Sequence, residues 1–420
     1  MRVGFYFGRE ISFNAKSGGA FTFLQSIFNQ LCKTSEKYEI FVFSDDADKF
    51  ENSDVVKFIK INRFYSDKDE NFLKKLILKI PRKILRFLQD KEYETALNKA
   101  VLDNQIDLLW FVTPGYEYVE IPYVYTVWDL QHRLQTYFPE VSANLEFERR
   151  EKSYNLAITK SSFIIIGNES GKKEVSKFYN YPDDRIKILP LPTPDFVFKD
   201  DFEEEIKETC DQNSFIKTQN SSKNFLFYPA QFWPHKNHIL ILYALKILNS
   251  KKFTDKYNLD FKVIFTGSDK GNLDYIKSQV VQLGLKDQVE FLGFVSTEKL
   301  IQLYKNAFAL VFPSFFGPDN IPPLEAFALG CPVIAAKVSG SEYQLKDAAL
   351  LFDPKNEYEL ADCIKKLYDD VDLRSTLIQK GFEIAKNWTA KEYVDGIYRI
   401  VDDFEPIRRC WSSKIIYKEK

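Results

Sequence analysis

The sequence has few of the residues that build metal sites, disulfide frameworks or membrane spans. Its 420 residues include three histidines, one methionine and five scattered cysteines, and no CxxC or Cys–His spacing occurs. Such cysteines argue against a disulfide framework and against structural zinc. No apolar run approaches the roughly 18 residues of a membrane span, and the stretch before Arg9 is too short for a signal peptide. We therefore expect a cytoplasmic protein that needs no metal.

An excess of charge of either sign is also absent. The chain carries 58 basic and 60 acidic residues, for a net charge of −2. This balance argues against a nucleic-acid binder that relies on bulk positive charge. The hydrophobic fraction of 45% excludes wholesale disorder and is sufficient for large cores.

Apolar runs that read as strands alternate with helical patterns, which predicts an α/β protein with parallel sheets. A first series occupies 1–195. Residues 196–223, which are acidic and then polar, are interpreted as a linker or insertion. A second series occupies 224–389, and the tail is mostly helical, with a last helix near 390–405. We expect two Rossmann-like domains that face each other across a cleft, with 390–420 returning to the first.

The strongest local signal spans 313–333, where a strand leads through a Gly/Pro-rich turn into a helix that starts at Pro322 and Pro323. Free backbone N–H groups at such a helix start favour anions. Glu325, one turn into this helix, is suited to accept hydrogen bonds from sugar hydroxyls. The alternative is an ordinary first helical turn with a capping acid.

A second signal is the run Tyr228–His238, which follows the first strand of the second series. Lys236 there would meet a phosphate at the sheet edge, and Asn237 would cap the following helix. A solvated loop lysine is the alternative interpretation. His235 and His238 have HxxH spacing but lack a third ligand, so the case for a metal is weak.

A third signal is the run Tyr125–Arg133, at the end of a strand in the first series. Polar side chains at this edge point into the expected cleft, and Asp129 is suited to act as a base or hydroxyl acceptor. An Asp–Arg loop pair is the alternative. The three histidines of the chain (His132, His235 and His238) all fall in the second and third signals.

Two weaker features complete the list of candidates. Asp46-Ala47-Asp48 matches a DxD metal motif, but we interpret it as a polar loop. Residues 73–88 carry six basic and no acidic residues among nine Leu, Ile and Phe. Two interpretations fit this composition equally well. The segment lies on an anionic membrane, or it is a helix that packs on the sheet and exposes a basic face to solvent.

With these motifs, the whole chain resembles the retaining glycosyltransferases of family 4, which have the GT-B architecture. The run Ile321-Pro322-Pro323-Leu324-Glu325-Ala326 matches the family motif and implies that Glu325 binds ribose. The family's first glutamate falls on Gly317, and Asp319 or Asn320 would take over its contacts to the donor sugar. Lys236 matches the phosphate-binding lysine, whereas its arginine partner is Gln231 here.

The resemblance extends to the remaining positions of the site. The histidine of the family's His-Asp pair is Trp128, followed by a matching Asp129, with His132 and Arg133 nearby on the acceptor side. Gly18 and Gly19 resemble the glycine loop near the transferred sugar. The family's nucleotide-contacting turns are matched by a further set of residues: Gly267, Ser268, Gly293, Phe294 and Val295.

The resemblance implies transfer of a hexose or deoxyhexose, with retention and without a metal. The donor would be a nucleoside diphosphate sugar of UDP or GDP type, and the acceptor a glycan or lipid-linked glycan of a bacterial surface polysaccharide. Asp129, Lys236 and Glu325 are the predicted catalytic residues. Two alternatives remain open: a sugar-nucleotide epimerase of similar fold, and a non-catalytic subunit of a polysaccharide assembly complex.

Overall fold

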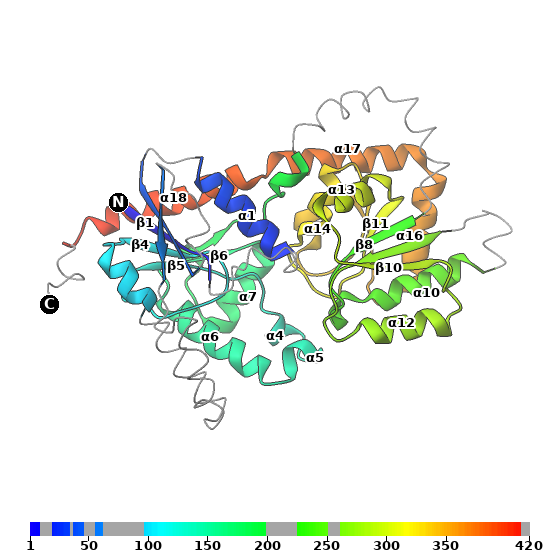
Figure 1. Ribbon diagram of the computed structural model, residues 1–420, viewed down its shortest axis with the longest axis horizontal. Helices are drawn as coiled ribbons and strands as arrows, with labels where there is room; N and C mark the ends of the chain where they lie inside the picture. Colours follow the sequence, from blue (N-terminus) through cyan, green and yellow to red (C-terminus); the bar gives the residue numbers. More distant parts are fainter. Residues whose placement is uncertain are drawn as a thin grey trace, which may run out of the picture.

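Two parallel β-sheets, flanked by helices, form the two halves of the computed structural model (Figure 1). The structure describes residues 1–8, 19–33, 37–45, 55–61, 96–198, 225–250 and 261–412. Gly18, the Asp46–Asp48 motif, the basic segment 73–88 and most of the predicted linker lie outside these ranges. No helix in the described ranges is long and apolar enough to cross a membrane.

The first sheet has seven strands in the order β3-β2-β1-β4-β5-β6-β7, a doubly wound arrangement. Its strands are β1 (Arg2–Tyr6), β2 (Glu39–Ser44), β3 (Val56–Lys60), β4 (Leu108–Phe111), β5 (Tyr123–Thr126), β6 (Phe163–Ile166) and β7 (Ile186–Ile188). The accompanying helices are α1 (Gly19–Leu31), α4 (Gln131–Leu134), α5 (Pro139–Ser142), α6 (Glu146–Lys160) and α7 (Glu169–Tyr179).

The second sheet has six strands in the order β10-β9-β8-β11-β12-β13. Its strands are β8 (Phe225–Pro229), β9 (Lys262–Thr266), β10 (Val289–Gly293), β11 (Ala309–Phe312), β12 (Val333–Ala336) and β13 (Ala349–Phe352). The helices are α10 (His238–Leu248), α12 (Leu273–Gln282), α13 (Thr297–Asn306), α14 (Ile321–Ala328), α15 (Ser341–Leu345), α16 (Glu357–Asp369) and α17 (Val371–Asn387). The expected fold class is confirmed.

Alternation of side chains along the strands gives the first sheet two buried faces. Phe5 and Phe7 pack on one face with α1, while Tyr6 between them packs on the other. The short strands are almost wholly buried, as parallel strands covered by helices on both sides should be.

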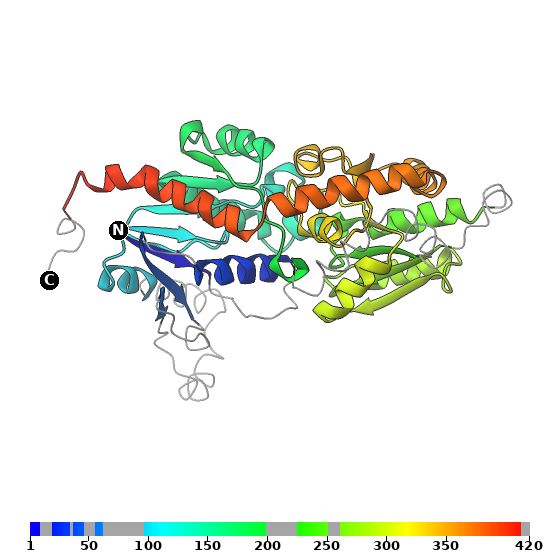
Figure 2. The same ribbon diagram turned by 90° about the horizontal axis from the view of Figure 1, so that it is seen from above.

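The last helix, α18 (Ala390–Arg408), leaves the second domain and packs against α1 of the first (Figure 2). It begins with a capping box. The side chain of Thr389 accepts from the backbone N–H of Glu392, and the side chain of Glu392 accepts from the backbone N–H of Thr389. The two segments that connect the domains lie side by side. Thr193 N donates to Trp388 O at 2.9 Å, and Trp388 Nε1 donates to Pro190 O at 2.8 Å. This is the predicted return of the C-terminal helix.

Candidate functional site

A cavity of about 390 Å³ lies between the two domains. The ends of β5 and β6 line it from the first sheet, and the ends of β8 and β11 line it from the second. The starts of α1 and α14 and the side chain of Tyr393 on α18 complete the lining. Because ligands of parallel sheets bind beyond the carboxyl ends of the strands, this cavity is the candidate site.

Lys236 brings a positive charge to the cavity from the short turn Pro234–Lys236 after β8. Its Nζ lies 5.2 Å from the centroid of the Phe312 ring, and no hydrogen bond or ion pair holds it among the residues that the structure describes. Burial lowers the pKa of Lys236 to about 8, against the opposing charges of Asp129 and Glu140. In the described part of the chain, no other lysine or arginine lines the cavity. Its charge is therefore available to an anionic ligand.

Asp129 faces the cavity from the loop after β5, and one of its oxygens is already occupied. Oδ1 accepts the Gln131 N–H at 2.9 Å and Nη2 of Arg150 at 2.5 Å. Burial would lower the pKa of Arg150, but the charge of Asp129 raises it above its usual value. Oδ2 of Asp129 has no hydrogen-bond partner in the described structure, so it can accept from a ligand hydroxyl.

The side of the cavity that belongs to the first domain is mostly apolar. We call this surface the apolar wall; its residues are Phe23, Trp128, Ile165, Leu189, Leu191 and Tyr393. The ring centroid of Phe23 lies 6.1 Å from that of Trp128 and 5.4 Å from that of Tyr393, both in edge-to-face geometry. Nε1 of Trp128 is buried, and it has no hydrogen-bond partner among the residues that the structure describes.

Asp319 also lines the cavity, but both of its carboxylate oxygens are occupied by the protein. Oδ2 accepts the Leu191 N–H of the other domain, and Oδ1 accepts Nε2 of Gln344 at 2.6 Å. Burial raises the pKa of Asp319 to about 7, although these two donors oppose the shift. Asn320 is similarly engaged, since its side-chain amide donates to Gly317 O at 2.6 Å. In the described structure, the polar side chains of Asp319 and Asn320 thus hold the loop between β11 and α14 in place.

The cavity brings together about half of the residues predicted from the sequence. Those that line it are Gly19, Trp128, Asp129, Gln231, Lys236, Asp319, Asn320, Ile321 and Pro322. Those that the structure places outside its lining are His132, Arg133, Asn237, Gly267, Ser268, Gly293, Phe294, Val295, Leu324 and Glu325. Gly18 lies outside the described residues.

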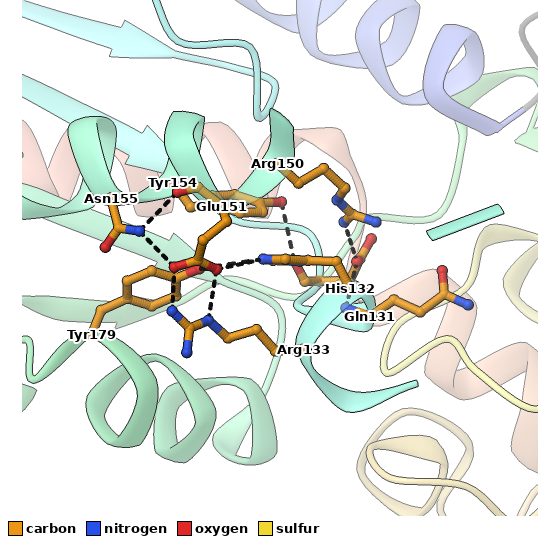
Figure 3. A network of polar contacts seen from close by, with 9 residues as sticks. Gln131, His132, Arg133, Arg150, Glu151, Tyr154, Asn155 and Tyr179 are labelled. Carbon is orange, nitrogen blue, oxygen red and sulfur yellow. Dashed lines mark hydrogen bonds and ion pairs between the residues drawn. The ribbon is translucent and has the colours of Figure 1, made fainter. Parts of the chain in front are cut away.

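His132 and Arg133 are turned toward the interior of the first domain. His132 is fully buried, stacks on Tyr154 and contacts Glu151 at 3.2 Å through Nε2. Arg133 forms a two-pronged pair with the same Glu151 and lies over the ring of Tyr179 (Figure 3). Burial lowers the pKa of His132, so this imidazole stays neutral at pH 7. Glu151 thus holds both side chains away from the cavity.

Glu325 and Asn237 are buried in the second domain. Oε2 of Glu325 accepts the hydroxyl of Tyr304 at 2.6 Å, and burial raises the pKa of Glu325 to about 7. Asn237 precedes α10, but the predicted side-chain cap is wrong. Its amide instead donates to Pro313 O at 3.1 Å and Pro354 O at 2.9 Å, because a backbone φ of 55° directs the side chain into the domain.

The glycine turns at the ends of β9 and β10 lie against each other, with Gly267 N donating to Gly293 O at 2.8 Å. Gly267 has φ +132°, and a Cβ on it would lie 2.4 Å from Ala230 O. The turn therefore packs tightly beside the loop that carries Gln231. Among the described residues, no group of three or more His, Cys, Asp or Glu could hold a metal ion.

Sequence reasoning missed the pair His235–Glu140, which joins the two domains beside Lys236. Oε1 of Glu140 accepts from the His235 backbone N–H at 3.0 Å and lies 2.6 Å from its ring Nδ1. Burial would raise the pKa of Glu140, but these hydrogen bonds lower it. Burial also lowers the pKa of His235. The two residues are 95 positions apart, so no local pattern links them.

Comparison with known proteins agrees with this geometry. Residues 211–384 match the family model "Glycosyl transferases group 1". The chain is 29% identical over 215 residues to the O-antigen chain mannosyltransferase RfbU of Salmonella typhimurium, covering 50% of this chain and 52% of the relative. It is 25% identical over 253 residues to the O-antigen chain mannosyltransferase B of Escherichia coli, covering 60% and 63%. The matches thus span only part of these relatives.

The fold has solved counterparts over nearly its full length. Anabaena HepE, solved in complex with UDP-glucose, superposes with a TM-score of 0.64 at 16% identity, covering 96% of this chain and 100% of that one. This likeness establishes the arrangement of the two domains. The resemblance inferred from the motifs is confirmed at the level of the fold and of this domain: the chain has the GT-B fold, and its residues 211–384 match the glycosyl transferases group 1 model.

Proposed function

We propose that the protein is a retaining glycosyltransferase that moves a hexose or deoxyhexose from a nucleoside diphosphate sugar, of UDP or GDP type, to a glycan or lipid-linked glycan. The observation that carries the proposal is the position of Lys236. Its ammonium group, which has no ion-pair partner among the described residues, lies in a cavity between two parallel sheets, where a diphosphate at the start of α14 would lie.

The transfer needs charge stabilisation more than a protein nucleophile. The bond between the sugar's anomeric carbon and the phosphate oxygen breaks, and the acceptor oxygen bonds to that carbon on the same face. The acceptor proton passes to the departing phosphate. Lys236 stabilises the charge that develops on the diphosphate, which is the kind of electrostatic contribution that dominates many enzymes. Oδ2 of Asp129, which has no partner in the described part of the chain, can accept a hydroxyl of either substrate.

The names of the relatives support the class of product. Two relatives are named as O-antigen chain mannosyltransferases. A fold neighbour binds UDP-glucose. From these we propose a role in bacterial surface polysaccharide synthesis, at the cytoplasmic side of the membrane, with no metal cofactor.

The proposal is tested first by nucleotide binding. Thermal shifts are measured with UDP, GDP, ADP, dTDP and CMP, and one diphosphate should raise the melting temperature by mass action. Lys236→Ala should lose that shift and about a hundredfold or more in transfer rate. Lys262→Ala is the matched control, because Lys262 is an exposed lysine at the start of β9, outside the cavity lining. Parental transfer by Lys236→Ala would contradict the assignment.

Stereochemistry and metal use are tested on the same reaction. The anomeric configuration of the product, read by NMR, should equal that of the donor. Activity should persist in excess EDTA. An inverted product would contradict the retaining step, and loss of activity that is restored by a divalent cation would contradict metal independence.

Membrane association is proposed through residues 73–88, which lie outside the described residues. Charge reversal at Lys74, Lys75, Arg82 and Lys83 should release the protein from anionic liposomes at moderate salt. Charge reversal at Lys172 and Lys173 on α7 is the control. Unchanged co-sedimentation of the first variant would show that the segment does not bind the membrane.

A further inference from the structure

The turn that carries Lys236 is held from three sides. The hydroxyl of Tyr228 on β8 donates to Lys236 O at 2.8 Å. The backbone N–H of Phe315, in the loop between β11 and α14, donates to His235 O at 2.9 Å. The third contact comes from the first domain, since Oε1 of Glu140 on α5 accepts the His235 N–H at 3.0 Å. Two of the three anchors therefore belong to the second domain, and one belongs to the first.

The side chain of Glu140 is buried in this contact. It is 6% exposed, and the side chain of His235 is 12% exposed. Oε1 of Glu140 also lies 2.6 Å from Nδ1 of His235. Because a carboxylate can only accept, Nδ1 carries the proton of the ring, and one oxygen receives both donors. Hydrogen bonds to a charged acceptor are stronger than neutral ones, so this pair fixes the backbone directly before Lys236.

The segment around α5 also contacts the second loop of the site. The ring centroid of Phe138 lies 6.2 Å from that of His235 and 5.7 Å from that of Phe315. Nε2 of Gln135 donates to Phe315 O at 2.9 Å. α5 lies on the side of the first domain that faces the second (Figure 1). One segment of the first domain thus holds both the turn with Lys236 and the loop that leads to α14.

Glu140 places a negative charge close to the expected diphosphate. Burial would raise its pKa, but the hydrogen bonds from His235 lower it, so the carboxylate is ionised at pH 7. Burial lowers the pKa of His235, so this ring is neutral at pH 7. No lysine or arginine forms an ion pair with Glu140 among the residues that the structure describes. The charge of Glu140 by itself therefore repels an anionic ligand.

We propose that Glu140 is a positioning residue for donor binding: acting through His235, it holds the turn that presents Lys236 to the diphosphate. This inference rests on the proposed function, since it assumes that Lys236 meets a diphosphate. Glu140 lies outside the cavity lining, so it acts on the ligand only through its neighbours. The first domain then completes a phosphate site whose lysine belongs to the second.

The sign of the effect separates positioning from charge. If Glu140 acted by its charge alone, its removal would strengthen the binding of an anion. If its hydrogen bonds position Lys236, their loss weakens binding, because the turn must then be ordered when the ligand binds. We expect Glu140→Ala to weaken nucleoside diphosphate binding about three- to tenfold at pH 7.

Two conservative variants separate the hydrogen bonds from the charge. In Glu140→Gln the amide oxygen can accept both donors of His235, and the amide nitrogen replaces Oε2, which is buried without a partner in the described part of the chain. Its affinity at pH 7 should stay within about threefold of wild type. Glu140→Asp keeps the charge but is one methylene shorter, so it should lose the contact and bind as weakly as Glu140→Ala.

The experiment measures dissociation constants by titration calorimetry on the full chain at pH 7. UDP, GDP and dTDP are titrated into wild type, and the nucleotide that binds is used for the variants. Asp107→Ala is the matched control. Asp107 also accepts two hydrogen bonds, from Nε of Arg408 at 2.6 Å and from the Arg2 N–H at 2.8 Å, but it precedes β4, at the end of the sheet away from the cavity. This variant should lose stability and keep its affinity.

Weaker binding by Glu140→Ala, with affinity recovered in Glu140→Gln, supports the inference. Equal or tighter binding by Glu140→Ala overturns it, as does an equal loss of affinity in Asp107→Ala. If Glu140→Ala does not fold, the conservative variants decide: weaker binding by Glu140→Asp than by Glu140→Gln supports the inference, and any other order overturns it. In these cases the proposed function stands. Failure of every nucleotide to bind wild type overturns the proposed function itself.

Discussion

The lowered pKa of Lys236 makes donor affinity depend on pH in a way that can be calculated. Without ligand the pKa is about 8, because burial removes water from the ammonium group. A bound diphosphate stabilises the charged form and should return the pKa toward the ordinary value of about 10.4. Between these two values, binding must take up a proton that the free protein has lost.

The size of the effect follows from linkage. From pH 7 to pH 9 the affinity for the nucleoside diphosphate should fall about tenfold, or about 1.4 kcal/mol. Proton uptake at pH 8 should be about half a proton, and it should approach one near pH 9. Calorimetry in buffers of different ionisation enthalpy measures this number directly, at pH values where the nucleotide's own phosphate groups are fully ionised.

Lys236→Arg is the control, because a guanidinium stays charged throughout this range. Its affinity should be flat from pH 7 to pH 9. Wild-type affinity that is also flat, with no proton uptake, would refute the reasoning.

A rise in pH weakens nucleotide binding through Lys236, but through the same residue it should stabilise the unliganded protein. Since the folded-state pKa of Lys236 is below the unfolded value, the unfolded chain binds more protons between about pH 8 and 10.4, and the unliganded protein gains stability as pH rises through that window. At pH 7 the charged lysine therefore opposes folding. Lys236→Met should raise the free energy of unfolding by up to about 3 kcal/mol while abolishing donor binding. Denaturant melts without ligand test this, and a destabilised variant would contradict it.

Two further predictions concern residues behind the site. Glu140→Ala should lower the free energy of unfolding by about 1–3 kcal/mol at pH 7, since it leaves the buried His235 without its partner. The pKa of Glu140 is lowered in the folded state, so denaturant melts should show the difference shrinking as pH falls below about 4.5; a difference constant with pH would count against the pair. Arg150→Met should lower kcat about tenfold with little change in nucleotide affinity, because it frees Asp129 to move. Arg150→Lys should recover part of the rate, and steady-state kinetics of Arg149→Met, which removes an exposed arginine paired with Glu146, should match wild type.

The fold could be predicted largely because buried parallel strands are short apolar runs separated by amphipathic helices. The apolar runs 107–112, 122–127 and 162–166 predict strands where the structure has β4, β5 and β6. Three strands were not predicted. β13 (Ala349–Phe352) is an apolar run all the same, whereas the other two are weak in this respect. β3 (Val56–Lys60) is an edge strand that carries two lysines, and β7 (Ile186–Ile188) has three residues and one lysine. Their pairing is decided by the neighbouring strand and not by local composition.

The residues of the site that could be predicted lie mostly in the loops and helix starts that follow strands. Lys236 and Asp129 follow β8 and β5, and the strand ends bring both into one cavity. His132 and Arg133 are equally close to a strand, but one helical turn rotates them toward Glu151 on α6. The direction in which these side chains point depends on Glu151, which is 18 or 19 residues away, and sequence spacing does not encode it.

The crossing of α18 has a consequence for the order in which the chain folds. The core on one face of the first sheet contains Tyr393, Val394, Ile397, Ile400 and Phe404, all from this helix. During synthesis, residues 1–195 therefore leave the ribosome with that face covered only in part, by α1. About two hundred further residues are needed to complete it, which at ordinary elongation rates takes on the order of ten seconds or more. The second domain, whose core includes no residue of α18 among those described, can fold first. The N-terminal half of this chain is thus the last to become native.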